Sequence, residues 1–128
     1  MPVQSVKATR KIIRKYVNKW VTPMGLGWWN VDVYYHMNKK EALKYFKTKK
    51  REWMVLGRTL SEWEYRTAAV HFNTHALSSC SAAEIEKTVV HELVHILVCE
   101  MREGTRKHEE AVVVGLERAF QWVREAAK

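Results

Sequence analysis

Cysteine is scarce in this chain, whose 128 residues include only Cys80 and Cys99. Two cysteines cannot form the disulfide framework of a small secreted domain, so we expect both to be free thiols in a reducing compartment. Long apolar runs are missing too. No stretch approaches the roughly 20 apolar residues of a membrane span, and the basic N-terminus lacks the apolar run of about 7–15 residues that marks a signal peptide. These absences predict a cytoplasmic protein with no membrane contact.

Internal repeats and low-complexity tracts are also absent from the sequence. The length suits a single domain over residues 1–128 with a core of its own. A hydrophobic content of 47% with six tryptophans argues against disorder. We therefore expect one folded domain, and a monomer.

Acidic residues are nearly missing from the first part of the chain. Residues 1–51 contain thirteen Lys and Arg against Asp32 and Glu41, a net charge of +11, whereas the remaining residues carry a net charge of −3. The cations cluster in residues 7–19 and 39–51, with aromatic residues between them. Such a surplus is a footprint for an anionic partner, nucleic acid in particular. The simpler interpretation is an ordinary solvated helix face.

Hydrophobic periodicity predicts three helices and three strands. The expected helices span 4–21, 82–102 and 106–127, and the expected strands lie within 28–37, 53–60 and 64–73. A short helical turn is expected around 42–46. Ser81 and Glu84 form a capping-box pattern at the start of the second helix. The predicted fold class is α+β, with an N-terminal helix, a small and mostly antiparallel three-stranded sheet, and two C-terminal helices.

The stretch His91-Glu92-Leu93-Val94-His95 carries the strongest functional signal. Histidines four residues apart lie on one side of a helix, where both imidazoles can bind one zinc ion at about 2.0–2.1 Å. Glu92 projects about 100° round the helix from His91, where it can serve as general base for a zinc-bound water. Both histidines lie at the margin of a broad apolar face. The alternative is two core histidines hydrogen-bonded to backbone groups.

A catalytic zinc usually takes a third protein ligand, and the helix expected at 106–127 offers several. Glu109 begins its inward stripe, and a tight antiparallel pair of helices would bring this carboxylate close to His95. We therefore expect Glu109 to be the third ligand, with His108 as the alternative, although the helix dipole alone would also favour a carboxylate at this position. The expected inward stripe is Glu109, Val112, Leu116, Ala119 or Phe120, and Val123, and the expected outward stripe is Glu110, Glu117, Gln121, Arg124 and Lys128.

Residues 65–125 resemble the small, single-domain zincin-like metallopeptidases found in phage and bacterial genomes. The resemblance covers a strand at 67–73, a short polar link at 78–81, the helix that contains the HExxH pattern, and a later helix at 108–113 that looks like the glutamate helix of a minimal gluzincin. SprT-like and ImmA/IrrE-like peptidases are the types that it suggests. SprT-like enzymes usually have a third histidine, which favours His108, and the NExxxD signature of larger gluzincins and the Met-turn ligand pattern of metzincins are absent.

This resemblance implies a zinc metalloendopeptidase that acts on protein or peptide substrates, with Zn²⁺ on His91, His95 and Glu109 and with Glu92 as the catalytic residue. It also implies that the strand at 68–73 forms the sheet edge above the metal, where a substrate can bind as an added strand. The candidate donors for the oxyanion are His71, His75, Tyr65 and His108. The alternative function is a nucleic-acid-binding module with a structural or vestigial zinc site.

Overall fold

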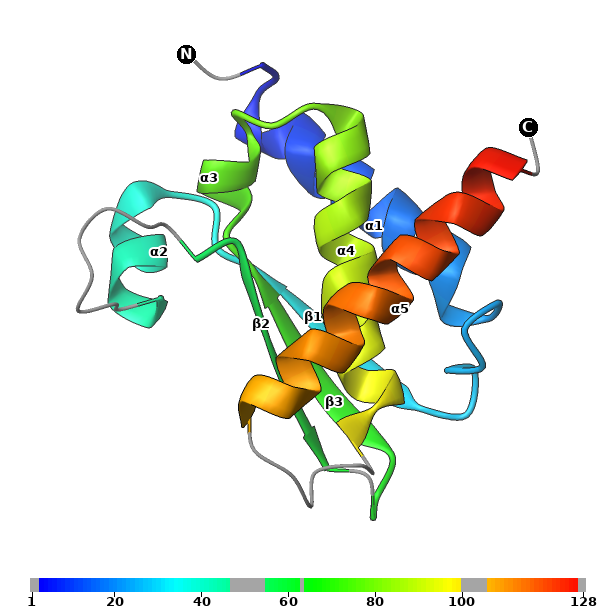
Figure 1. The fold of residues 1–128 in the computed structure, drawn as a ribbon. Helices are drawn as coiled ribbons and strands as arrows, with labels where there is room; N and C mark the ends of the chain where they lie inside the picture. The colour runs from blue at the N-terminus through cyan, green and yellow to red at the C-terminus, as the bar shows by residue number, and fades with distance from the viewer. Residues whose placement is uncertain (1–2, 47–54, 63, 100–105, 127–128) are drawn as a thin grey trace.

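The computed structural model describes residues 3–46, 55–62, 64–99 and 106–126, with the side chains at 106–112 and 126 outside that description. In chain order the elements are α1 (Val6–Val21), β1 (Asn30–Tyr35), α2 (Lys39–Tyr45), β2 (Gly57–Glu62), β3 (Thr67–Phe72), α3 (Thr74–Leu77), α4 (Ala82–Leu97) and α5 (Arg106–Ala126). The fold is α+β, as the sequence predicts, and each expected helix and strand has a counterpart (Figure 1). Only α3 was not expected, because four residues are too few to show a helical period.

Side-chain caps determine where two of the long helices begin. The Ser5 hydroxyl accepts a hydrogen bond from the Ala8 amide at 3.1 Å at the start of α1. At the start of α4 the expected capping box is present: the Ser81 hydroxyl accepts from the Glu84 amide at 3.2 Å and donates to the Glu84 carboxylate at 3.1 Å. These contacts satisfy amides that have no partner within the helix. They fix the start of the helix that carries the HExxH pattern.

The sheet is mixed, with the strand order β1–β3–β2. β3 pairs with β1 in parallel and with β2 in antiparallel orientation, so that Val70 lies opposite both Val33 and Thr59. The expectation of a mostly antiparallel sheet therefore holds for only one of the two strand pairs, because the segment between β1 and β3 is long enough for a parallel crossover. The expectation that the strand at 68–73 forms the sheet edge is wrong. β3 is hydrogen-bonded on both sides, and the edge strands are β1 and β2.

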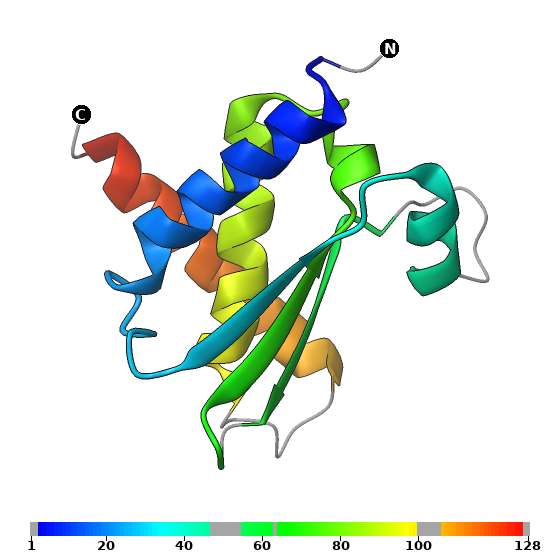
Figure 2. The same cartoon turned by 180° about the vertical axis from the view of Figure 1, so that it is seen from behind.

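α4 lies at the centre of the molecule. It contacts α1 and α5 as well as β2 and β3 of the sheet (Figures 1 and 2). Its side chains Ile85, Val89, Leu93 and Val94 are fully buried, and burial of one such side chain contributes about 1.5–3 kcal/mol to stability. Packing therefore fixes α4 along most of its length. Among the described residues, no helix combines the length and apolar character needed to cross a membrane.

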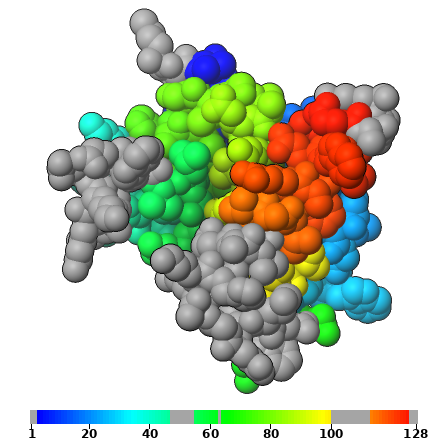
Figure 3. Space-filling model, in the orientation of Figure 1, coloured from blue at the N-terminus to red at the C-terminus, as the bar shows by residue number. Residues whose placement is uncertain are grey.

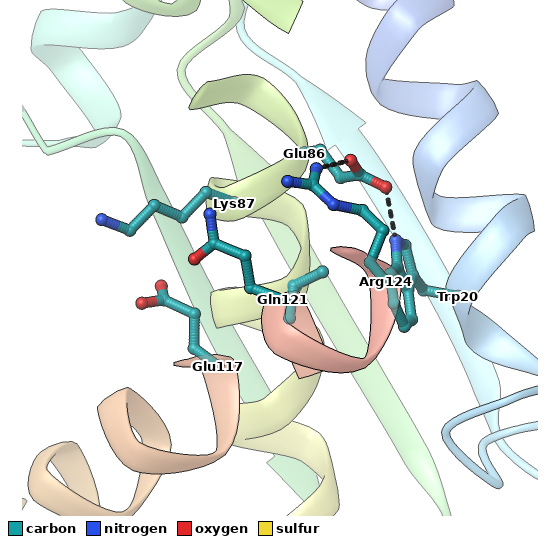
Figure 4. Close-up of a pocket in the computed structure, with 7 residues that line it drawn as sticks. Trp20, Glu86, Lys87, Glu117, Gln121 and Arg124 are labelled. Atoms are coloured by element: carbon teal, nitrogen blue, oxygen red, sulfur yellow. Dashed lines mark hydrogen bonds and ion pairs between the residues drawn. The ribbon is translucent and has the colours of Figure 1, made fainter. Parts of the chain in front are cut away.

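Glu86 joins the three long helices. Its carboxylate accepts hydrogen bonds from Trp20 Nε1 on α1 at 2.9 Å and from Arg124 on α5 (Figure 4). It also accepts one from Lys19 Nζ on α1 at 2.8 Å. Burial would raise the pKa of Glu86, but the three donors together hold this pKa below its ordinary value. A buried carboxylate thus connects α1 and α5 to α4, in addition to the apolar contacts.

The orientation of α5 differs from the expected one. Glu117 is only 5% exposed and Arg124 bonds to a buried carboxylate of α4, although both were expected to face solvent. Conversely, Val123 was expected to face the core and is 62% exposed. The residues of α5 that face the rest of the molecule include Val113, Leu116, Glu117, Phe120 and Arg124. The expected stripes were therefore right for Leu116 and Phe120. They were wrong for Glu117, Arg124 and Val123, because a charge pattern alone does not show which charged residues find buried partners.

Candidate active site

His91 and His95 lie one turn apart on α4, as their spacing predicts. Their ring centroids are 5.1 Å apart, with an angle of 72° between the ring planes. Both residues are partly buried, whereas Leu93 and Val94 between them are fully buried. The two histidines therefore lie at the border between the core and the surface, which confirms the position expected from the margin of the apolar face.

The carboxylate of Glu117 reaches the His91 ring from α5. Glu117 Oε1 lies 3.1 Å from His91 Nδ1. A carboxylate at this position favours the neutral tautomer with the proton on Nδ1, which is the tautomer whose Nε2 can ligate a metal ion. This contact was not predicted from the sequence, because Glu117 was expected on the outward stripe. The available signal was the spacing of Val113, Glu117 and Arg124, which puts all three on one face of the helix.

Glu92 is buried against β2. This residue is 6% exposed, and Thr59 Oγ1 donates to its carboxylate Oε1 at 2.7 Å and lies 3.1 Å from its backbone carbonyl oxygen. Gly57 faces the same side chain: a Cβ at this position would lie 2.9 Å from Glu92 Cγ and 3.0 Å from its Oε2. Neither contact was predicted, because the alternation of a strand does not reveal which strand faces which helix.

An open pocket of about 460 Å³ lies between α4, α5 and the start of β2. His91, Glu92 and Glu117 all line it, whereas His95 lies one turn further along α4 and does not. The remaining lining residues are Leu56, Gly57, Cys80, Glu84, Lys87 and Thr88. In the space-filling view, the green surface near the start of β2 lies beside the orange surface of α5 (Figure 3). Buried carboxylates beside an imidazole in an open pocket are typical of binding and catalytic sites.

Glu109 and His108 lie in the first turn of α5, but their side chains are outside the described residues, so Glu109 stays a prediction. Among the side chains that the structure does describe, no group of three or more His, Cys, Asp or Glu could hold a metal ion. The described groups nevertheless have suitable chemistry for zinc. They are two imidazoles one turn apart and a carboxylate that orients one of them.

The contacts between α4 and α5 show which part of α5 passes His95. Arg124 meets Glu86, and Glu117 meets His91, so the two helices run in opposite directions. Moving along α4 from His91 to His95, a distance of about 6 Å, corresponds to moving along α5 from Glu117 toward its N-terminus. Glu109 lies in that direction, about 12 Å along the axis from Glu117. This is about twice the step of about 6 Å from His91 to His95, so the residue of α5 level with His95 is closer to Val113, and Glu109 lies about one turn beyond it.

The three candidate oxyanion donors with described side chains all lie away from the pocket. His71 is on the sheet face opposite to α4, because the alternate residues of β3 fill the core. Its ring stacks on Tyr45 with centroids 4.1 Å apart, and its Nδ1 lies 3.1 Å from His36 Nε2. Tyr65 is 75% exposed in the turn before β3, and His75 lies in α3. The pocket lining includes none of these candidates.

No family model matches this chain, and neither a curated protein nor a solved structure matches it. The functional argument therefore depends on the residues of the chain and on their geometry.

Proposed function

We propose that this chain is a zinc metallopeptidase, in which His91 and His95 bind the metal and Glu92 is the general base for peptide-bond hydrolysis. The contact between Glu117 and His91 carries the proposal, because a carboxylate against Nδ1 favours the tautomer in which Nε2 has the lone pair that a metal ligand needs. The same contact lies in a pocket that Glu92 also lines, which favours this proposal over two core histidines with a purely structural role.

Each residue of the site has a distinct role in this proposal. A bound zinc ion would lower the pKa of a coordinated water and polarise the scissile carbonyl. Glu92 accepts a proton from the attacking water and passes it to the leaving amine. Glu117 holds the tautomer and the orientation of His91. Glu109 is the proposed third ligand, with His108 as the alternative.

The edge strand β2 is the proposed binding site for an extended peptide substrate. Leu56 and Gly57, at the start of this strand, line the pocket together with Glu92. The outer N–H and C=O groups of an edge strand can pair with an added strand, so that backbone hydrogen bonds hold the substrate with modest side-chain selectivity. Substrate binding was expected at β3, but β3 is hydrogen-bonded on both sides, so β2 takes this role in the proposal.

Hydrolysis of a fluorescently labelled, unfolded protein tests the proposal. We expect the zinc-loaded wild-type protein to cleave this substrate, and we expect a chelator to abolish cleavage until zinc is restored. Glu92→Gln should be folded and zinc-bound but inactive, whereas the matched variant Glu125→Gln, on α5, should keep its activity. Cleavage that survives both the chelator and Glu92→Gln would contradict the proposal.

A second candidate function is nucleic-acid binding through the outer face of α1. The side chains of Ile13, Val17 and Trp20 are buried, so the opposite face of this helix is directed outward (Figure 2). The helix contains no acidic residue, and its exposed cations are Lys7, Arg10, Lys11, Arg14, Lys15 and Lys19. Of the second basic cluster, Lys39, Lys40 and Lys44 are exposed, and residues 47–51 lie outside the described part. A row of cations on one helix face suits a phosphate backbone.

Binding to a DNA duplex at increasing salt tests this second function. We expect the logarithm of the association constant to fall linearly with the logarithm of the salt concentration, by a slope of about −0.9 for each phosphate contacted. The charge reversal Lys11→Glu/Arg14→Glu should weaken binding strongly, whereas Arg118→Glu, an exposed cation of α5, should not. Equal affinity of the Lys11→Glu/Arg14→Glu variant and the wild type would contradict this function.

A further inference from the structure

Two residues of β2 enclose the carboxylate of Glu92. Successive side chains of a strand alternate between its faces, so Gly57 and Thr59 lie on one face of β2 and Arg58 and Leu60 on the other. Thr59 is buried, at 8% exposure, whereas Leu60 is 52% exposed. The face that contains Gly57 and Thr59 is therefore the one that contacts α4.

Gly57 and Thr59 act on different oxygen atoms of the same carboxylate. The Thr59 hydroxyl donates to Glu92 Oε1 at 2.7 Å, within the usual range for a hydrogen bond between a hydroxyl and a carboxylate. On the Gly57 side, a Cβ would approach Glu92 Cγ, Cδ and Oε2 to between 2.9 and 3.0 Å. The hydroxyl thus fixes one side of the carboxylate, and the missing side chain of Gly57 makes room for the other side.

The start of β2 is itself held in place by Asn73, the residue that follows β3. The Asn73 side-chain amide donates to the Val55 carbonyl at 3.0 Å, and its backbone amide donates to the Leu56 carbonyl at 2.9 Å. Asn73 is fully buried. The backbone that leads into Gly57 is therefore tied to the centre of the sheet, so Gly57 cannot easily move away from Glu92.

We propose that Thr59 and Gly57 are positioning residues, which set the rotation of the Glu92 carboxylate for its role as general base. This inference rests on the proposed peptidase function. The proposed substrate edge and the residues that orient the base lie on the same strand. A misplacement of about 1 Å can cost about a hundredfold in rate, so a hydroxyl that fixes this carboxylate has a measurable effect on catalysis.

Steady-state hydrolysis of the labelled unfolded protein by Thr59 variants tests the positioning role. Thr59→Val should lower kcat by about 10–100-fold while KM stays within about twofold, because the substrate contacts are unchanged. Thr59→Ser keeps the hydroxyl and should restore kcat to within about threefold of wild type. Gly57→Ala should also lower kcat. The matched control is Thr9→Val, since Thr9 is a fully buried threonine of α1 whose hydroxyl donates to the Ser5 carbonyl.

Two results would overturn the positioning role: an unchanged kcat for Thr59→Val, or an equal loss for Thr59→Ser and Thr59→Val. A loss of activity in Thr9→Val as large as that in Thr59→Val would also overturn it, because general destabilisation would then explain both.

Thermal unfolding in the presence of a chelator provides a readout that does not need activity. Thr59→Val should lower the unfolding midpoint by several degrees, roughly 3–8 °C, in the wild-type background, because it removes a hydrogen-bond donor from a buried carboxylate. In the Glu92→Ala background the same substitution should have a much smaller effect, because the carboxylate is gone. Equal effects in both backgrounds would mean that Thr59 holds only the backbone carbonyl of Glu92, and this would overturn the positioning role. A wild type that binds no zinc would overturn the proposed function separately.

Discussion

Among the side chains that the structure describes, two pairs of neighbouring histidines have different surroundings. His91 and His95 lie on one helix with their rings nearly edge to face, and one of them contacts a buried carboxylate in an open pocket. His36 and His71 lie on the outer side of the sheet with centroids 5.3 Å apart. They contact each other through ring nitrogens 3.1 Å apart, and Tyr45 stacks against both rings.

The comparison shows that proximity of two imidazoles does not by itself indicate a metal site. In the outer pair, a ring nitrogen of each histidine contacts a ring nitrogen of the other, and aromatic rings pack around them. A metal ion there would have to break the contact between the rings. In the inner pair, the carboxylate of Glu117 occupies the nitrogen that a metal does not need. The neighbours of the imidazoles therefore distinguish the two pairs.

The largest expected difference between the pairs is in zinc affinity. His95→Ala should reduce zinc affinity by at least about a thousandfold, because it removes one of the proposed ligands of the ion. His71→Ala should leave zinc affinity unchanged and serves as the matched control. Isothermal titration calorimetry of zinc into metal-free protein measures both constants. If His95→Ala and His71→Ala have similar zinc affinities, the inner pair is not a zinc site that the outer pair lacks.

Substitutions of two glutamates of α5 separate a ligand from an orienting carboxylate. Glu117→Gln should weaken zinc binding by about 10–100-fold, the usual cost of losing a partner that orients a metal ligand. Glu109→Ala should weaken it more, because a proposed ligand is removed. Zinc competition with a chromogenic chelator measures the two effects. If Glu117→Gln weakens zinc binding more than Glu109→Ala does, Glu117 is itself the third ligand, and Glu109 is not.

Loss of the Arg124 contact should affect the inner pair more than the outer pair. Arg124→Met leaves the buried Glu86 with fewer donors, and we expect a loss of about 1–3 kcal/mol in the free energy of unfolding. Because α5 also presents Glu117, zinc affinity should fall in the same variant. Urea unfolding and zinc titration provide the two measurements. The Arg118→Met variant, altered at an exposed position of the same helix, should change neither.

The smallest expected effect is an acid sensitivity that arises from the outer pair. The pKa values of His36 and His71 are lowered, chiefly by burial, so these rings bind protons more readily in the unfolded chain than in the folded one. The neutral forms of the two rings stabilise the fold fully above the ordinary histidine pKa of about 6.5. This stabilisation is lost as the pH falls toward the lowered pKa values that the two rings have in the folded chain. His71→Phe should flatten the pH dependence of the unfolding midpoint below about pH 6.5. If the pH dependence is unchanged in His71→Phe, the acid sensitivity arises from other groups.

Local sequence patterns were sufficient to predict most elements of the fold. Ser81 and Glu84 mark the start of α4, and an apolar period without glycine or proline carries the helix through the HExxH pattern. The positions of His91 and His95 relative to each other follow from helix geometry alone. Cys80 and Cys99, the only cysteines of the chain, form no disulfide in the structure, as their small number suggests.

The missed contacts depend on how separate elements pack. The roles of Glu117 and Arg124 depend on the rotation of α5 about its axis, which buried polar partners on α4 determine. The contacts of Thr59 with Glu92 depend on the position of β2 beside α4, and the alternation of residues does not specify the order of strands in a sheet. The edge position of β3 was expected only from the resemblance to zincin-like enzymes, and β3 lies at the centre of the sheet.

Anomalous diffraction at the zinc absorption edge, from crystals of the zinc-loaded protein, locates the metal and so tests the proposed zinc site. We predict one peak between His91 and His95, at about 2.0–2.1 Å from a ring nitrogen of each, with Glu117 still on the other nitrogen of His91. A peak at the outer pair of His36 and His71, or no peak at the inner pair, would contradict the account.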